Sequence, residues 1–127
     1  MDMQMILGIG TDILNIQRIR DILDGDSDAF VQQSFTIKEQ EEALSRPDFV
    51  SYYATRFAGK EAVFKCFGID EDIRINEIEI LSLGTGQPQV TLSGKVKAIA
   101  TKKGIKHVQL SLSYDADHAI AFAVAQD

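Results

Sequence analysis

Charged residues interrupt an apolar segment at 56–68, which reads RFAGKEAVFKCFG. On a helix that turns by about 100° per residue, its phenylalanines form one aromatic stripe, with Lys60 inside the stripe and Glu61 at its edge. A lysine in this position can lie along the rings and extend its ammonium to water or to a carboxylate. Alternatively, the stripe borders a pocket in which Lys60 meets an anion. Helical spacing alone leaves both interpretations open.

Two neighbouring residues carry a similar ambiguity. Gly59 costs a helix about 0.5–1 kcal/mol relative to alanine, so we expect a reason for its presence. Its missing side chain would admit either a ligand or a closely packed strand. Glu61 and Lys65 are four residues apart, a spacing that also produces ordinary surface ion pairs worth about 0.3–0.5 kcal/mol.

A second carboxylate of interest lies in the segment GIGTD, residues 8–12. Gly-x-Gly after a strand is found in dinucleotide-binding loops, but no third glycine follows here, and we reject that interpretation. Asp12 continues an Ile-rich strand, where a carboxylate needs a partner. It is either a cap for the helix that follows Asn15 or a ligand for a hard cation such as Mg²⁺.

The other reactive side chains form no catalytic pattern. His107 and His118 have no cysteine or histidine nearby at ligand spacing, so we assign both to structure or surface. Cys66, the only cysteine, lies among phenylalanines, as a small buried residue does. No Ser/His or Cys/His pair is visible, so the chain offers no obvious nucleophile of its own.

The composition of the 127 residues predicts one domain, 1–127, with a substantial core, since 45% of the residues are hydrophobic. A net charge of −6 argues against general nucleic-acid binding. The N-terminus does not have the pattern of a signal peptide, and the longest apolar run is too short to span a bilayer. We therefore expect a cytoplasmic protein with no membrane partner. The five lysines from Lys95 to Lys106 predict a solvated helix face.

Apolar spacing and capping residues predict the elements that must position these side chains. Strands are expected at 5–14, 73–83, 90–92, 108–112 and 119–125, with a phase slip near Asn76-Glu77 that indicates a bulge or two short strands. Helices are expected from Asn15 to Gly25, from the Thr36/Glu39 capping box to Arg46, from Pro47 to Phe67, and from Ser93 to Lys103, with a short helix or turn at 26–34. The fold class is α+β, a mostly antiparallel sheet packed against a long central helix.

Together these segments resemble a known family. The motifs are GIGTDI at 8–13 followed by Arg18-Ile19, FTxxE at 35–39, RFAGKEAxxKxxG at 56–68, GxP at 86–88 and the strand SLS at 111–113. In order, spacing and total length they are similar to the small bacterial 4′-phosphopantetheinyl transferases, the holo-[acyl-carrier-protein] synthase type. The resemblance covers nearly the whole chain and implies a 4′-phosphopantetheinyl transferase-like fold.

The resemblance also implies a reaction. The family moves 4′-phosphopantetheine from coenzyme A to a serine of apo acyl carrier protein and releases 3′,5′-ADP, which supports fatty acid biosynthesis. By resemblance, Asp12 and Glu61 are ligands of Mg²⁺, and Lys65 joins them as a catalytic residue that reaches the phosphates. The serine proton is then taken by Glu61 or by a water molecule on the ion. Contacts to coenzyme A are expected from Arg56, Lys60, Lys65, Gly86 and Pro88, which match the family's motifs, and from Tyr114, which departs from the family pattern but can hydrogen-bond a phosphate or stack on adenine.

Three further expectations follow from the resemblance. Tyr114 stands where many members carry histidine, and with a pKa of about 10 it is a poor base at neutral pH. Arg18 and Arg20 are expected to meet the acidic carrier protein, with the Lys95–Lys106 cluster as an alternative docking or coenzyme site. Members typically form homotrimers with active sites between subunits. The rival hypotheses are a non-catalytic relative that binds coenzyme A or a nucleotide, and a metal-dependent hydrolase of coenzyme A.

Overall fold

The structure, a computed structural model, describes residues 5–68 and 72–127. In chain order its elements are β1 (Ile6–Asn15), α1 (Ile16–Asp24), α2 (Ser27–Ser34), α3 (Ile37–Leu44), α4 (Phe49–Cys66), the 3-10 helix η1 (Ile75–Glu77), β2 (Ile78–Ser82), β3 (Pro88–Leu92), α5 (Gly94–Lys102), β4 (His107–Tyr114) and β5 (His118–Gln126). This arrangement confirms the predicted α+β class.

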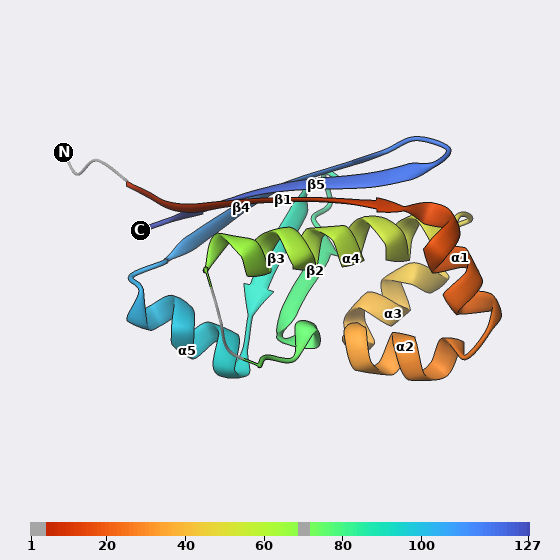
Figure 1. The fold of residues 1–127 in the computed structure, drawn as a ribbon, viewed down its shortest axis with the longest axis horizontal. Helices are drawn as coiled ribbons and strands as arrows, with labels where there is room; N and C mark the ends of the chain where they lie inside the picture. Colours follow the sequence, from red (N-terminus) through yellow and green to blue (C-terminus); the bar gives the residue numbers. More distant parts are fainter. Residues whose placement is uncertain (1–4, 69–71) are drawn as a thin grey trace.

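The strands form two antiparallel sheets, with the order β1-β5-β4 in one and β2-β3 in the other. The long helix α4 lies against the three-stranded sheet, with α1, α2 and α3 gathered near one of its ends and α5 near the other (Figure 1). Strands β3 and β4 are neighbours without a shared ladder, so the predicted sheet is divided in two.

Small residues allow α4 to approach the three-stranded sheet closely. The alternating residues of β5 that face the helix are all alanines and all buried: Ala119, Ala121, Ala123 and Ala125. The larger side chains Ile120 and Phe122 point to the opposite face of the same strand and remain about half exposed. The sheet therefore has one face packed on α4 and a second, apolar face that is open in this chain.

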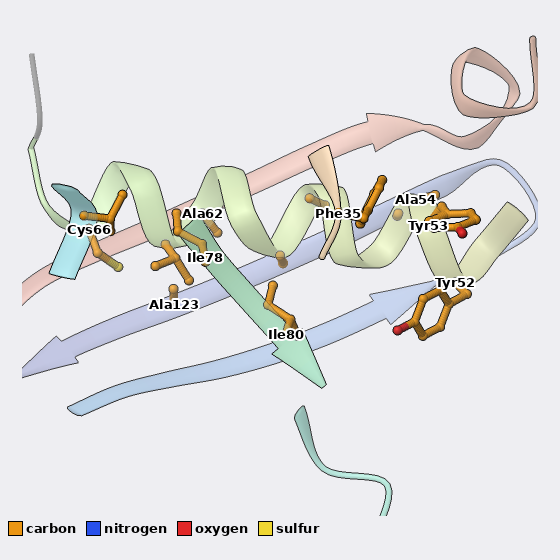
Figure 2. Close-up of a cluster of buried hydrophobic side chains, with 14 of the residues drawn as sticks. Phe35, Tyr52, Tyr53, Ala54, Ala62, Cys66, Ile78, Ile80 and Ala123 are labelled. Atoms are coloured by element: carbon orange, nitrogen blue, oxygen red, sulfur yellow. The ribbon is translucent and has the colours of Figure 1, made fainter. Parts of the chain in front are cut away.

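Helix α4 is buried around most of its circumference, because β1 and β5 cover one side and β2, α1 and α3 cover others. Figure 2 shows the resulting core, in which Ala62 and Cys66 of α4 lie near Ile78 of β2 and Ala123 of β5, while Phe35 and Tyr53 pack together nearer the other end of the helix. Among the aromatic side chains of the predicted stripe on α4, Phe49 is the exception to this burial, since it is 48% exposed.

Two predicted boundaries change for local reasons. The segment expected as a strand at 73–83 begins with η1 and becomes β2 only at Ile78, so the phase slip marks a 3-10 turn. The Glu77 carboxylate accepts a hydrogen bond from Val96 N at 3.0 Å, and in this way it caps α5 in place of the expected Ser93 side chain. Helix α4 begins at Phe49 rather than Pro47, because the Asp48 side chain accepts from Ser51 N.

Candidate active site

The backbones of β1 and α4 are in direct contact, and this contact positions the first carboxylate. Built Cβ atoms on Gly8 and Gly10 would each lie 1.9 Å from a carbonyl oxygen of α4, that of Cys66 and that of Ala62. Only glycine fits at these two positions. Alternation along the strand puts Asp12 on the same face as the two glycines, so its side chain is directed to α4. The Gly-x-Gly pattern thus serves strand–helix packing.

Asp12 forms an ion pair with Lys65 across this contact. The Lys65 ammonium lies 3.2 Å from the Asp12 carboxylate and donates to the Thr11 carbonyl at 3.0 Å. The Asp12 side chain is 17% exposed and the Lys65 side chain 52% exposed, so the pair is open to solvent on the lysine side. Asp12 caps no helix, because Asn15 performs that function for α1 by accepting from Gln17 N.

Glu61 lies close enough to Asp12 for the two carboxylates to interact. Burial raises the pKa of Glu61, the Asp12 charge raises it further, and the Lys65 charge opposes both effects. Two carboxylates that repel each other in a partly dry setting favour a cation between or beside them. Glu61 also lines a cavity of about 810 Å³. The predicted trio of Asp12, Glu61 and Lys65 is therefore brought together.

Lys60 points in a different direction and is fully buried. Its ammonium lies 2.7 Å from the Glu39 carboxylate and also donates to the Ile78 carbonyl. Glu39 accepts in addition from Ile80 N at 2.8 Å and from Thr36 N at 2.9 Å. With both side chains at 0% exposure, Lys60 joins α4 to α3 and β2 and presents no charge to a ligand. This arrangement does not favour the expected coenzyme contact, and it matches the alternative in which the ammonium reaches a carboxylate.

Gly59 also has a packing role. A Cβ atom there would lie 2.7 Å from Ile80 and 3.1 Å from Leu112, the side chains that β2 and β4 direct at the helix. Of the two interpretations of this glycine, the structure supports close helix–strand packing rather than room for a ligand.

Arg56 belongs to a second cluster near the start of α4. Its guanidinium stacks on the Tyr52 ring at 4.3 Å and donates to Ser82 Oγ at 2.6 Å, with Glu42 at 3.5 Å. Burial lowers the pKa of Arg56, and its Tyr52 and Glu42 partners oppose that shift. Within the described residues, Arg56 Nε is buried and has no hydrogen-bond partner. An unpaired buried donor is costly, which makes this guanidinium a candidate for binding an anion.

The same cluster includes Tyr114, which is 58% exposed at the end of β4. Arg56 and Tyr114 line a cavity of about 160 Å³ together with Arg46. Arg46 contacts two of the residues that Arg56 also contacts. Its guanidinium lies 3.7 Å from the Glu42 carboxylate and 5.5 Å from the centre of the Tyr52 ring. Sequence reasoning missed Arg46; the signal was its four-residue spacing from Glu42, although α3 itself ends at Leu44.

The remaining predicted residues lie apart from these clusters. Gly86 has φ +87° in the turn between β2 and β3, and Pro88 begins β3 and lines a cavity of about 270 Å³ against β4. Arg18 and Arg20 are exposed on α1. His107 and His118 are exposed, in agreement with a surface assignment.

The lysine cluster is partly engaged in structure. Lys95 donates to the Asp72 carbonyl at 3.1 Å, and Lys103 donates to the Phe67 carbonyl at 2.6 Å. Lys97, Lys102 and Lys106 are exposed, as expected for a solvated face.

Among the described residues, the groups of this site that could bind a metal are the carboxylates of Asp12 and Glu61. Within residues 5–68 and 72–127, no group of three or more His, Cys, Asp or Glu side chains could hold a metal ion. Asp12 and Glu61 offer only oxygen, the donor that Mg²⁺ prefers, and they leave the other coordination positions to a ligand and water. The same part of the chain contains no helix that is long and apolar enough to cross a membrane.

Comparison with known proteins gives consistent matches. The family model described as "4'-phosphopantetheinyl transferase superfamily" matches residues 8–123. A holo-[acyl-carrier-protein] synthase of Desulforudis audaxviator is 38% identical over 95% of this chain and 93% of its own length.

Solved structures agree with the sequence matches. The holo-[acyl-carrier-protein] synthase of Neisseria meningitidis superposes with a TM-score of 0.88 at 34% identity, covering 97% of this chain and all of that one. The Helicobacter pylori synthase, solved in complex with coenzyme A, gives a TM-score of 0.80 at 28% identity over 92% of this chain and 98% of its own.

Proposed function

This chain belongs to the 4′-phosphopantetheinyl transferase superfamily, and on that premise we propose that it transfers 4′-phosphopantetheine from coenzyme A to a serine of apo acyl carrier protein, supporting fatty acid synthesis. The observation that carries the proposal is the meeting of Asp12, Glu61 and Lys65. These residues come from motifs far apart in the sequence, and simple binding of a nucleotide does not require two adjacent carboxylates.

Asp12 and Glu61 would hold Mg²⁺. The donor set fits this ion, because both groups are carboxylates, the Asp12 charge raises the pKa of Glu61, and Asp12 is partly open to solvent. When bound, the ion would neutralise the pyrophosphate of coenzyme A and stabilise the charge that grows on the leaving phosphate. A lysine ammonium, that of Lys65, already balances one of the two carboxylates in this structure.

The residues of this chain orient a reaction whose nucleophile belongs to the partner. The serine oxygen of the carrier protein forms a bond to the phosphorus that bears the pantetheine arm, and the bond from that phosphorus to the oxygen of the leaving 3′,5′-ADP breaks. The serine proton must pass to a base. Glu61, or a water molecule held by the cation, would take it. Lys65 would add positive charge beside the phosphates.

Arg56 and Tyr114 are proposed to bind the nucleotide part of coenzyme A, with Gly86 and Pro88 from the β2–β3 turn. Arg56 and Tyr114 line one cavity, and this supports the assignment, since a guanidinium can bind an anion and the exposed Tyr114 ring can stack on a base. Arg46, in the same cavity, offers a second guanidinium. Lys60 is not part of this proposed site, because its ammonium is enclosed by Glu39 and Ile78.

A homotrimer with sites between subunits is part of the proposal. On the open face of the three-stranded sheet, Ile9 and Ile13 of β1 are each 62% exposed. Because β1 pairs with β5, these side chains lie beside Ile120 and Phe122 of β5. An apolar face of this kind is unusual on a monomer and suits burial against another copy. Sedimentation or light scattering should give close to three times the chain mass of 14.1 kDa, and a stable monomer would contradict this part.

The carrier protein is proposed to dock on α1 through the exposed Arg18 and Arg20. Carrier proteins present an acidic helix, so exposed guanidinium groups give the complementary charge. We place the reaction in the cytoplasm, which is compatible with Cys66 as a free, buried thiol.

The decisive experiment is intact-mass spectrometry of apo acyl carrier protein after incubation with this protein, coenzyme A and Mg²⁺. The expected result is a mass increase equal to one phosphopantetheine, lost when Mg²⁺ is chelated. A known transferase serves as the control for carrier competence. If that control modifies the carrier and this protein does not, the proposal is wrong, and coenzyme A binding without transfer would identify a non-catalytic relative.

A further inference from the structure

Helix α5 and the two strands that it connects, β3 and β4, enclose a cavity of about 280 Å³. The helix lies at the end of the molecule opposite α1, α2 and α3 (Figure 1). Lys97 and Thr101 line the cavity from α5, Thr91 lines it from β3, and Lys106 lines it from the segment just before β4. None of these four residues lines the cavities of about 810 Å³ and 160 Å³ described above.

The charge around this cavity is positive, although the whole chain has a net charge of −6. From Ile80 to Tyr114, a stretch that includes β3, α5 and β4, the sequence contains five lysines and no Asp or Glu. Lys97 and Lys106 are exposed, and among the described residues neither forms an ion pair. Because they come from different segments, two ammonium groups are available to one ligand in the cavity.

Two acidic residues approach these elements from the β2 side, and both have other partners. The Glu77 carboxylate accepts from Val96 N at 3.0 Å and caps α5. Glu79, which is opposite Thr91 in the β2–β3 ladder, accepts from the Thr36 hydroxyl at 2.6 Å. In the part of the chain that the structure describes, neither carboxylate pairs with a lysine of this cavity, so the positive charge there is not neutralised.

The inner wall of the cavity is apolar. Ala100 and Ile105 are buried, and Leu92 and Val108 are partly buried. At the rim, the exposed Thr91 carries a hydroxyl that can donate to an oxygen of a ligand. The volume is slightly below the roughly 300–1,000 Å³ of sites for drug-sized molecules. A ligand that suits this cavity therefore has a small apolar body and a strongly negative end.

We propose that this cavity binds a small organic phosphate, that is, a phosphate monoester on an apolar body of a few carbon atoms. Such a monoester carries a charge of about −1.5 to −2 at pH 7, which two lysine ammonium groups can balance. Lysine binds phosphate as a point charge, and Lys97 and Lys106 supply two. The apolar body lies against Ala100 and Ile105, where it is removed from water. This ligand site is separate from the transfer reaction and is not required by it.

Calorimetry with n-butyl phosphate tests the chemical class of the ligand. Inorganic phosphate lacks the apolar body and n-butanol lacks the charge, so we expect n-butyl phosphate to bind at least about tenfold more tightly than either. Absence of n-butyl phosphate binding to the wild-type protein, or equal binding of inorganic phosphate, would overturn the proposal.

Variants on α5 and before β4 locate the probe. Lys97→Gln and Lys106→Gln should each raise Kd for n-butyl phosphate by about tenfold. Lys102→Gln is the matched control, since Lys102 is exposed on α5 and does not line the cavity, and it should change Kd by less than about twofold. An equal effect of all three variants would show general attraction to the lysines and contradict a defined site.

A second pair of variants separates cavity from charge. Thr101→Trp fills the cavity and keeps both of its lysines, so it should weaken binding by about tenfold. Ala98→Trp, at an exposed position of the same helix outside the lining, should leave Kd unchanged. Binding that survives Thr101→Trp would place the phosphate outside the cavity and refute the proposal.

Two further arms exclude other sources of the same chemistry. Lys106 also lines the cavity that Pro88 borders, so the titration is repeated with saturating coenzyme A and Mg²⁺. The Kd for n-butyl phosphate should not change, and displacement of the probe by coenzyme A would overturn a separate site. Vesicles that contain phosphatidate should not bind the protein; co-sedimentation that Lys97→Gln abolishes would assign the phosphate to a lipid headgroup instead of a small free ligand.

Discussion

A Cβ atom on Gly10 would lie only 1.9 Å from the carbonyl oxygen of Ala62. This contact between the backbones of β1 and α4 sets the distance at which the strand crosses the helix. Asp12 is two residues farther along the strand and Glu61 precedes Ala62, so the same contact determines how closely the two carboxylates approach. The close strand–helix packing that Gly8 and Gly10 allow therefore sets the spacing of the candidate metal ligands.

Gly10→Ala should destabilise the fold and separate the carboxylates. The clash is with backbone atoms, which cannot move aside cheaply, so we expect a loss at the upper end of the roughly 1–3 kcal/mol typical of overpacking. Denaturant unfolding measures it, with Gly84→Ala as the control, because no atom lies within 4 Å of a Cβ at Gly84. A Gly10→Ala protein as stable as the control would show that the strand and helix can part without cost.

Lys60→Met should reduce stability rather than ligand binding. It leaves the Glu39 carboxylate buried without its cation, a change that typically costs about 3–5 kcal/mol. The exposed Lys97→Met should stay within about 0.5 kcal/mol of wild type. Unfolding curves and the Kd for coenzyme A separate the two roles: an unchanged stability with a weakened Kd would return Lys60 to the coenzyme site.

Asp12→Ala and Glu61→Ala should each lower the rate of transfer by more than about 100-fold while the protein remains folded. Each variant removes one of the two carboxylates proposed to hold the cation. Mass-spectrometric transfer assays and circular dichroism test the prediction, and the exposed Glu41→Ala controls for loss of a negative charge. Near-normal transfer in either variant would remove that residue from the site.

Tyr114→Phe should keep transfer within about threefold of wild type. The Tyr114 side chain is more than half exposed, and a protonated phenol makes a poor base at neutral pH. Stacking on the nucleotide would survive the loss of the hydroxyl. The assay compares kcat and KM for coenzyme A; a collapse of kcat with normal coenzyme A binding would prove that the hydroxyl takes part in the chemistry.

Arg18→Glu should raise KM for the carrier protein by about tenfold and leave the Kd for coenzyme A unchanged, because charge reversal on α1 repels an acidic helix. Lys102→Glu tests the alternative docking site on α5 with the same change of charge. An effect confined to Lys102→Glu would move the carrier interface from α1 to the lysine cluster.

Local signals in the sequence were reliable where the physics is local. The capping box predicted at Thr36 and Glu39 forms, with both reciprocal hydrogen bonds, and Asn15 caps α1 as expected. The beginning of β2 was placed too early because the apolar residues around η1 alternate like those of a strand. That pattern ends at Glu77, whose carboxylate caps α5. This helix begins 17 positions later in the chain.

Residue types and their spacing determined the α+β class, the long central helix and the family resemblance, and that resemblance implied that Asp12, Glu61 and Lys65 form one candidate site. Only the tertiary structure shows the role of Lys60. Helical phase places this residue in an aromatic stripe, but it does not reveal the ion pair with Glu39 on a neighbouring helix. The packing roles of Gly8, Gly10 and Gly59 are likewise visible only in the tertiary structure. A glycine in the sequence indicates that another group approaches closely, but it does not identify that group as a helix, a strand or a ligand.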